Sequence, residues 1–593
     1  MCGFAGEHRP GERPDVAAVE AMAATMAPRG PDGAGSWSAG PVALAHRRLK
    51  IIDLSEQGSQ PLVDPHVGRT VAFNGCIYNH RELRAELERE GHRFFSTSDT
   101  EVIAKAHASW GDRCVDRFMG MFSFALVERE SGRLLLARDR LGIKPLYLAD
   151  VGGALRFGST LPGLLAGGGI DTSIDPVALH HYLSWHGVVP PPHTILQGVR
   201  KLPPATLLVV EPDGLRTQER YWSAPHSRLP EQELWDEHDW QDALLDALRT
   251  AVDRRMVADV PVGVLLSGGL DSSLIVALLA EAGQHGLETF SIGFESGGGR
   301  EGDEFRYSDL IAQEFGTEHH KLPIATSRMV PALDGAIAAM SEPMVSHDCV
   351  AFYLLSEQVS RSCKVVQSGQ GADEVLAGYS WYQAVSEQAG GGTGADAYRA
   401  AFFDRPHAEF AEMLEADHLL ERDASRAFAE EHFGRPHADE PVDRALRLDT
   451  EVMLVDDPVK RVDNMTMAWG LEARVPFLDH EFVELAAACP PALKLAHGGK
   501  GVLKEASRRV LPAAVIDRPK GYFPVPQLSA LEGEALELVR DVMASPRARE
   551  RGLFRRGYVD MLLSDPPAHE TTLEGSKLWQ VALLELWLQR HGL

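Results

Sequence analysis

Cysteine is scarce in this chain and is never arranged in pairs. The 593 residues contain six cysteines, with neither CxxC spacing nor the density of a disulfide-bonded scaffold. Such isolated cysteines indicate free thiols, because zinc ribbons and small secreted domains need closely spaced pairs. One of them, Cys2, directly follows the first methionine.

Long basic and long apolar runs are also missing. Lys and Arg total 59 against 85 Asp and Glu, a formal net charge of −26. This charge repels a phosphate backbone, so no nucleic-acid partner is expected. The apolar stretch 262–280 is interrupted by Asp271, and no run reaches the roughly 20 apolar residues that span a bilayer. No membrane insertion is expected.

The first fifteen residues, MCGFAGEHRPGERPD, lack the basic start and the apolar segment of a signal peptide. This predicts a cytoplasmic protein.

The length predicts at least two large domains, since one hydrophobic core stops growing beyond about 250–300 residues. Residues 2–215 contain short β-type runs separated by Gly, Pro and Asn, which is typical of an α+β domain built on antiparallel sheets. Residues 216–240 are polar and contain Pro225 and Pro230, which predicts a linker.

Residues 241–593 have a different pattern. A helical periodicity over 241–256 is followed by a buried-type strand at 260–266, and further strands are expected at 289–294 and 364–369. Strands alternating with helices predict a parallel α/β sheet covered on both faces. The segment 383–450 has helical periodicity and carries no recognisable chemistry.

Cys2 is the first candidate for chemistry. Because Gly3 is small, removal of the methionine would leave the thiol on the N-terminal residue, where the free α-amine, with a pKa near 8, could act as the base for its own nucleophile. An incidental thiol is the alternative when Cys2 is considered alone.

The surrounding motifs favour the nucleophile. The chain contains RGPDG at 29–33, HRRLKIIDLSEQGSQP at 46–61, FNGCIYNH at 73–80 and SDTEV at 98–102. This order and spacing resemble the class II glutamine amidotransferases, whose glutaminase domain is an N-terminal nucleophile hydrolase with layered antiparallel sheets and helices.

The resemblance implies a role for each matching residue. Cys2 corresponds to the nucleophile, and Asn74 and the backbone N–H of Gly75 correspond to the oxyanion hole, with Asn74 also contacting glutamine. Arg48 corresponds to the bidentate partner of the glutamine α-carboxylate, and Asp99 to the partner of its α-ammonium.

One position departs from this family. Where the pattern reads FNGEIYN, this chain has Cys76. A thiol cannot supply the carboxylate, so we expect the ammonium to depend more on Asp99 and glutamine to bind more weakly. Cys76 as a space-filling residue against the sheet is the alternative.

The second motif is SGGLDSS at 267–273, which joins an apolar strand to a helix. Such a loop directs backbone N–H groups and the positive end of the helix dipole at an anion. It lacks the lysine of a Walker A loop and resembles the pyrophosphatase-type loop of ATP enzymes that form an acyl-adenylate.

That resemblance implies ATP and Mg²⁺ as cofactors, with Asp271 and Asp373 as the aspartates that hold Mg²⁺. SIGF at 291–294 resembles a strand whose backbone contacts adenine, although a buried core strand is an equal alternative. The ATP-binding residues implied are Ser267, Gly268, Gly269, Leu270, Asp271, Ser272, Ser273, Ile292, Ser368 and Gly369.

Three further motifs, EARVPFLD at 472–479, LKEA at 503–506 and RPKGYFPVP at 518–526, complete a resemblance to the glutamine-hydrolysing asparagine synthetases. This implies an AMP- and pyrophosphate-forming carbon–nitrogen ligase whose small-molecule partners are glutamine, ATP and a carboxylate acceptor. Lys520 corresponds to the catalytic lysine that neutralises charge at the acyl-adenylate, and a surface lysine is the alternative. Relatives often form homodimers, but no sequence feature locates an interface.

Two departures concern the acceptor. Gln370 replaces the carboxylate of the usual SGEG or SGDG, and the segment 341–357 differs from a typical asparagine synthetase. With Cys76, these features resemble the branch that amidates N-acetylglutaminylglutamine in osmolyte synthesis, with aspartate as the rival acceptor. Glu374, Glu342 or a channel for neutral ammonia could replace the missing base. A β-lactam-forming cyclase relative is a further alternative, disfavoured by the intact glutaminase residues.

Overall fold

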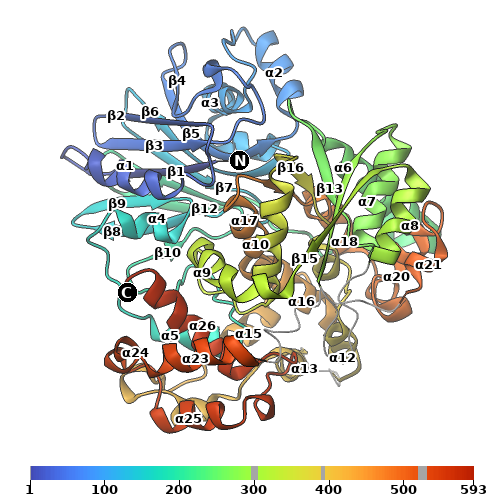
Figure 1. Cartoon of the computed structure of the whole chain (residues 1–593). Helices are drawn as coiled ribbons and strands as arrows, with labels where there is room; N and C mark the ends of the chain where they lie inside the picture. The colour runs from blue at the N-terminus through green and yellow to red at the C-terminus, as the bar shows by residue number, and fades with distance from the viewer. Residues whose placement is uncertain (1, 295–304, 389–393, 519–530) are drawn as a thin grey trace.

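The computed structural model describes residues 2–294, 305–388, 394–518 and 531–593. The N-terminal part carries two antiparallel six-stranded sheets, and a five-stranded parallel sheet follows (Figure 1). The predicted fold class, a layered α+β domain followed by an α/β domain, is confirmed. None of the described helices combines the length and the apolar character needed to cross a bilayer.

The two antiparallel sheets pack face to face. Phe4, Leu44, Ala72 and Leu136 come from both sheets and belong to one buried cluster. Helices cover the outer faces, with α1 (Val16–Thr25) on the first sheet and α3 (Asp99–Trp110) on the second. The first sheet has the order β10-β8-β9-β1-β3-β2 and the second β12-β11-β7-β6-β5-β4. Their strands are β1 (Gly3–His8), β2 (Gly33–Ala39), β3 (Val42–Arg48), β4 (Leu62–Asp64), β5 (Arg69–Ile77), β6 (Gly120–Glu128), β7 (Leu134–Arg138), β8 (Tyr147–Val151), β9 (Ala154–Gly158), β10 (Arg200–Lys201), β11 (Thr206–Val210) and β12 (Arg216–Arg220).

The segment 216–240, predicted as a linker, begins and ends in regular structure. Residues 216–220 form β12 at the edge of the second sheet, and α6 (Glu237–Arg254) begins with a capping box at Asp236. The irregular part of this segment therefore lies between β12 and α6.

The parallel sheet has the order β15-β14-β13-β16-β17. Its strands are β13 (Val262–Leu265), β14 (Glu288–Phe294), β15 (Glu318–Ile324), β16 (Val365–Gln367) and β17 (Glu472–Arg474). The chain runs outward from β13 to β15 and then returns to the other side of β13 with β16. The carboxyl ends of β13 and β16 flank this reversal, where open α/β sheets bind ligands.

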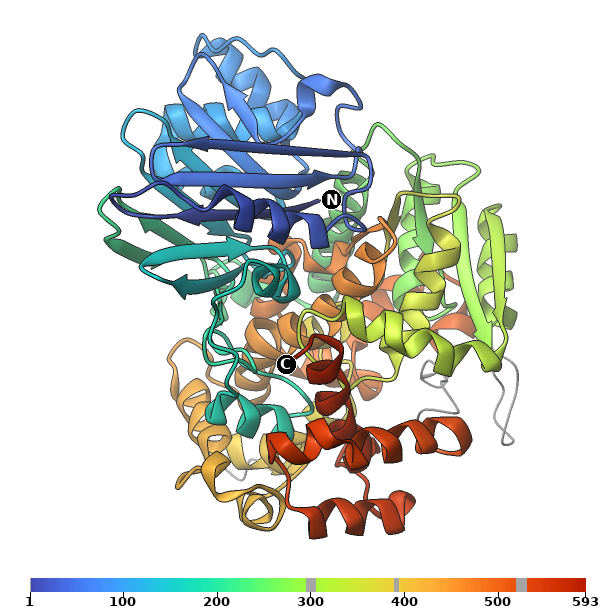
Figure 2. The same cartoon turned by 60° about the vertical axis from the view of Figure 1, so that its left-hand side comes forward.

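Helices cover the parallel sheet and extend below it (Figures 1 and 2). Those beside the sheet include α7 (Leu270–Glu281), α8 (Phe305–Phe315), α9 (Met329–Ala339), α10 (Asp348–Val359), α17 (Lys460–Met467), α18 (His480–Ala488) and α20 (Gly501–Ser507). A lower helical layer contains α12 (Ser380–Gln388), α13 (Ala395–Phe402), α15 (Ala424–Gly434), α16 (Pro441–Leu448), α23 (Gly533–Ala544), α24 (Pro546–Arg551), α25 (Arg556–Ser564) and α26 (Lys577–Arg590).

One N-terminal helix leaves its own sheets. α5 (Pro176–Ser184) packs beside α15 in the lower layer, and Tyr182 on it donates a hydrogen bond to the carbonyl of Gln580 (2.8 Å). The lower layer is therefore built from segments far apart in the sequence.

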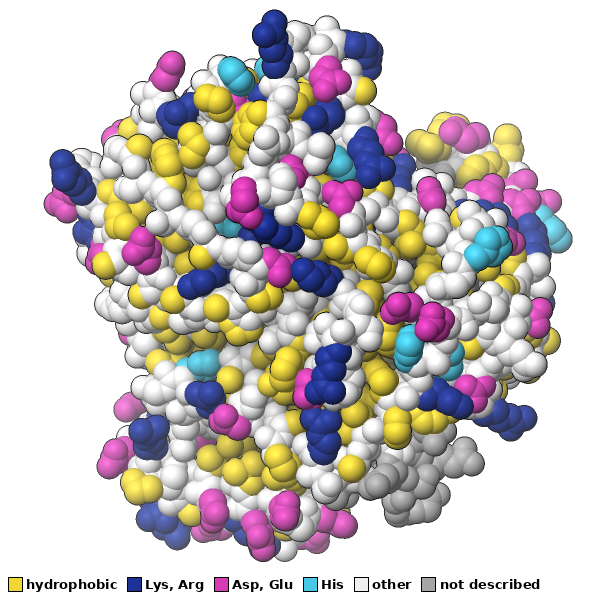
Figure 3. All heavy atoms as spheres, turned by 45° about the horizontal axis from the view of Figure 1, so that its top comes forward, with side chains coloured by type: hydrophobic (Ala, Val, Ile, Leu, Met, Phe, Trp, Pro, Cys, Tyr) yellow, Lys and Arg dark blue, Asp and Glu magenta, His cyan; other side chains and the backbone are white. Residues whose placement is uncertain are grey.

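Acidic and basic side chains are interspersed on the face drawn in Figure 3. No single-sign stripe crosses this view, so it offers no extended basic track of the kind that follows a phosphate backbone.

Candidate active sites

The first candidate site lies at the start of β1. Cys2 is 6% exposed, and its backbone N–H donates to Oδ1 of Asn74 on β5 (3.1 Å). Arg48, Gly75 and Asp99 line the same small pocket. Burial raises the pKa of the Cys2 thiol, opposed in part by the Leu49 N–H and the Arg48 guanidinium. The thiol therefore needs a base before it can attack.

Asn74 and Gly75 lie beside this thiol. The side-chain Nδ2 of Asn74 is buried and finds no hydrogen-bond partner among the described residues. A buried donor without a partner is costly, and an anion beside it would remove that cost. At Gly75, a Cβ atom would collide with the carbonyl oxygen of Met121, so only glycine allows this close approach of β5 and β6.

Arg48 and Asp99 are both buried and held by backbone groups. The guanidinium of Arg48 donates to the carbonyl of Ser55 (2.8 Å) and to that of Asp53 in the loop after β3. Asp99 begins α3, and its Oδ2 accepts the N–H of Ile77 (3.1 Å). Burial raises the pKa of the Asp99 carboxyl, opposed in part by His80 and the Ile77 N–H.

Two residues of this pocket were missed by the sequence analysis. Glu472 and Arg474 on β17 line it from the parallel sheet. They form a buried ion pair (Nε–Oε1 2.6 Å), and Nη2 of Arg474 lies 3.8 Å from the Cys76 Sγ. Burial alone would raise the pKa of Glu472, but nearby positive charge, Arg474 included, lowers it to about 2. The motif EARVPFLD can be recognised in the sequence. No local pattern shows, however, that its Arg474 contacts Cys76, which lies 398 residues earlier in the chain.

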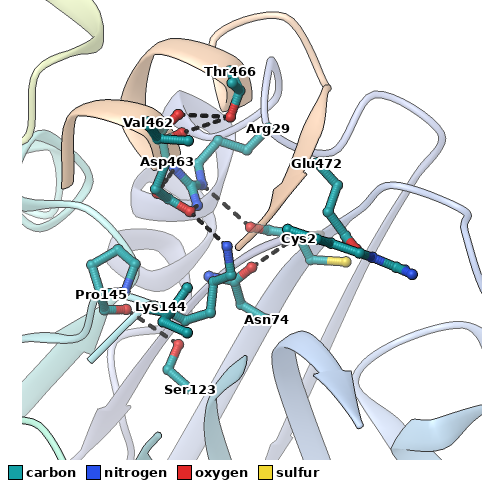
Figure 4. A network of polar contacts seen from close by, with 12 residues as sticks. Cys2, Arg29, Asn74, Ser123, Lys144, Pro145, Val462, Asp463, Thr466 and Glu472 are labelled. Carbon is teal, nitrogen blue, oxygen red and sulfur yellow. Dashed lines mark hydrogen bonds and ion pairs between the residues drawn. The ribbon is translucent and has the colours of Figure 1, made fainter. Parts of the chain in front are cut away.

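A buried ion network also connects Cys2 to the parallel-sheet part (Figure 4). Arg29 donates from Nε to the carbonyl of Cys2 (3.3 Å) and from Nη1 to Asp463 on α17 (2.9 Å). Lys144 contacts the same carboxylate (3.2 Å). The position of the thiol thus depends on a charged residue of the other part of the chain.

The second candidate site is a cavity of about 360 Å³ at the carboxyl ends of β13 and β16. From the predicted ATP-binding set, the residues that line it are Ser267, Gly269, Leu270, Asp271, Ser272, Ile292, Ser368 and Gly369. α7 begins at Leu270, and the first turn of this helix lines the cavity with Leu270, Asp271 and Ser272, which is where a helix directs its backbone N–H groups.

Two residues of the predicted ATP-binding loop, Gly268 and Ser273, are not among the residues that line the cavity. Gly268 has φ +71°, and a Cβ atom there would come within 2.6 Å of the backbone nitrogen of Ser308. Gly268 therefore allows the tight turn of this loop. The buried hydroxyl of Ser273 lies close to that turn and has no hydrogen-bond partner among the described residues.

Lys500, which was not predicted from the sequence, lies between the two predicted metal ligands. Its Nζ is 2.9 Å from Asp271 and 3.0 Å from Asp373. Burial lowers the pKa of Lys500, but the two carboxylates outweigh burial and raise it. The local sequence feature that could have indicated Lys500 is the glycine-rich turn before α20. Lys520 lies outside the described residues.

A buried thiol pocket and a cavity at the start of α7 lie in two parts of one chain, and the family matches of these two parts show that the chain is a glutamine-dependent amidotransferase. A glutamine amidotransferase domain model matches residues 1–222, and an asparagine synthase model matches residues 243–589. The chain belongs to the asparagine synthase family, whose members use ATP, and the enzyme class predicted from the sequence is confirmed.

Curated relatives match along almost the whole chain. Asparagine synthetase (glutamine-hydrolyzing) 3 of Bacillus subtilis (strain 168) is 29% identical over 95% of this chain and 93% of its own length. Asparagine synthetase (glutamine-hydrolyzing) 1 of the same strain is 30% identical over 99% and 96%. A putative asparagine synthetase (glutamine-hydrolyzing) of Mycobacterium tuberculosis (strain ATCC 25618 / H37Rv) is 31% identical over 99% and 97%.

Proposed function

We propose that this protein hydrolyses glutamine at Cys2 and uses the ammonia to amidate a carboxylate that ATP has activated. After methionine removal, the α-amine of Cys2 takes the thiol proton, and the sulfur attacks the side-chain amide carbon of glutamine. The amide nitrogen leaves as ammonia, and water then cleaves the glutamyl thioester to release glutamate. The free Nδ2 of Asn74 and the Gly75 N–H stabilise the oxyanion.

In the second half-reaction, the acceptor carboxylate attacks the α-phosphorus of ATP, releasing pyrophosphate, and ammonia then displaces AMP. Asp271 and Asp373 both contact the Lys500 nitrogen, at 2.9 and 3.0 Å respectively, and we propose that this pair of carboxylates holds Mg²⁺, which would neutralise phosphate charge. Lys500 holds positive charge beside the cavity, and Lys520 is proposed for the same task at the acyl-adenylate.

We propose N-acetylglutaminylglutamine as the acceptor. The observation that carries this proposal is the position of the atypical segment 341–357, which supplies Asp348, Phe352 and Leu355 to the wall of the ATP-site cavity. The acceptor must reach the α-phosphate from this cavity, so a changed wall indicates a changed acceptor. The dipeptide has no ammonium group, unlike aspartate, and needs less negative charge in its site.

Aspartate remains the second candidate acceptor, because the relatives described above are named asparagine synthetases. The test is pyrophosphate release with ATP, Mg²⁺ and ammonium, comparing the two acceptors at equal concentration. We expect a kcat/KM at least ~100-fold higher for the dipeptide. The reverse preference would make the chain an asparagine synthetase and would leave the altered segment without a substrate-based explanation.

Glu374 is the better candidate for the base that Gln370 cannot provide. Its Oε1 accepts the hydroxyl of Tyr379 (2.7 Å), and Tyr379 lines the cavity. Burial and the neighbouring Asp373 raise the pKa of Glu374 to about 7, which suits proton transfer near neutral pH. Neither Glu374 nor Glu342 is among the described residues that line the cavity itself, and Glu342 contacts Lys201 (3.2 Å) and Tyr147, neither of which lines the cavity.

Cys76→Glu should tighten glutamine binding. The pocket's ionised Glu472 is already paired with Arg474, so the glutamine ammonium is left mainly to Asp99. A new carboxylate at position 76 adds a charge-assisted hydrogen bond, about 1.5–3 kcal/mol before desolvation. Steady-state glutaminase assays should give a KM about tenfold lower, with ammonium-dependent amidation unchanged.

Cys76→Gln is the matched control, because it has the same shape without the charge. An equal fall of KM in both variants would show that charge at position 76 is not what limits glutamine binding.

A further inference from the structure

A cluster of metal-ligating side chains lies in the lower helical layer, apart from both sites described above. It joins His180 on α5, His407 at the start of a short 3₁₀ turn (His407–Glu409), and Asp423, the N-cap residue of α15. α5 and α15 lie side by side below the sheets (Figures 1 and 2). Segments separated by more than 200 residues therefore meet at this point.

The three ligand atoms converge. Nε2 of His180 lies 2.9 Å from Nδ1 of His407 and 3.8 Å from Oδ1 of Asp423. All three atoms lie within 4.8 Å of one another. In a tetrahedral zinc site with bonds of about 2.0–2.2 Å, ligand atoms are separated by about 3.3–3.5 Å, so small side-chain shifts suffice to place a single ion between them.

Hydrogen bonding orients the ring of His180. Its Nδ1 lies 2.9 Å from the Oγ of Ser425. If Nδ1–H donates to that hydroxyl, the lone pair of Nε2 points into the cluster, which is the arrangement of most metal-bound histidines.

Packing also limits how the cluster can move. The His180 ring stacks on Phe410 with centroids 4.3 Å apart. Asp423 accepts the N–H of Arg426 (2.8 Å), and Arg399 lies 4.0 Å from its other oxygen. These contacts hold Oδ1 toward His180, so the site is largely formed before a ligand arrives.

We propose that His180, His407 and Asp423 bind a divalent transition-metal ion of the Zn²⁺ class, with water as the fourth ligand. Two imidazoles and one carboxylate suit Zn²⁺ rather than Mg²⁺, which prefers oxygen ligands. The ion would tie α5 to the 407–423 region, so its role is structural. This site is independent of the proposed ATP-site Mg²⁺ and of the acceptor.

The test uses the full-length protein after removal of metal with a chelator. Zn²⁺ is titrated by calorimetry in constant excess Mg²⁺, which occupies oxygen-only sites. We expect one tight site per chain in the wild type and an affinity at least ~100-fold lower in His407→Ala. His418→Ala, a histidine of the same region outside the cluster, is the matched control and should bind like the wild type.

A second readout is thermal unfolding. Zn²⁺ should raise the Tm of the wild type and of His418→Ala but not that of His407→Ala, because only a ligand that binds the folded state stabilises it. Should His407→Ala fold poorly, Asp423→Asn keeps the helix cap and removes the charge, with the same expected loss of affinity. Absence of a tight site in the wild type, or binding by His407→Ala and Asp423→Asn equal to that of the wild type, would overturn the proposal.

Discussion

Cys2→Ala should abolish glutamine-dependent amidation, with glutamate release falling by ~10³-fold or more. Two cysteines line this pocket, Cys2 and Cys76, and Cys76 has its pKa raised by burial and lacks the α-amine that methionine removal would give Cys2. Amidation with added ammonium should continue, because the ATP-site cavity is separate. Glutamate release and pyrophosphate release, measured with each nitrogen source, check this.

Cys114→Ala is the matched control, since this buried thiol lies in the same part of the chain but not in the pocket. It should keep both activities. Retention of glutamine turnover in Cys2→Ala would refute the proposed nucleophile, and a wild-type protein inert toward glutamine would favour a cyclase.

Asp271→Asn should impair the ATP-dependent half-reaction and spare glutamine hydrolysis, which is the opposite of the effect expected for Cys2→Ala. Asp271 lines the cavity and, with Asp373, surrounds the Lys500 ammonium. Loss of a proposed Mg²⁺ ligand removes several kcal/mol of charge stabilisation at the phosphates, which corresponds to ~10²–10³-fold in rate. Pyrophosphate release should therefore fall with either nitrogen source, whereas glutamate release should persist.

Asp246→Asn is its control, because this exposed aspartate on α6 forms an ion pair with a surface arginine, Arg249 (2.7 Å), and does not line the cavity. Equal loss of glutamate release in Asp271→Asn would indicate a folding defect rather than a lost metal ligand. Unchanged pyrophosphate release would remove Asp271 from the proposed site.

Local elements were predicted well because their signals are local. The strand expected at 260–266 is β13 (Val262–Leu265), and the helix expected over 241–256 lies within α6 (Glu237–Arg254) and its C-terminal turn. The periodicity of apolar residues and the position of glycine-rich turns depend on residues a few positions apart. They therefore predict a strand or helix without knowledge of its tertiary contacts.

Residues that enter a site from a distance could not be predicted in this way. Glu472 and Arg474 reach the Cys2 pocket only because β17 ends beside the second antiparallel sheet. Lys500 reaches two aspartates more than 100 residues away. The segment 383–450 showed no recognisable chemistry in the sequence, because the third member of the cluster with His407 and Asp423 is His180, which comes from α5.

By itself, the sequence determined the two domain types, the family and the two loops that carry the proposed chemistry, because motif order and short-range periodicity are properties of the chain. Only the tertiary structure decided which charges share a pocket. Long-range contacts depend on how the sheets and helices pack, so the ion network from Cys2 to Asp463 and the histidine cluster at α5 exist only in the folded molecule.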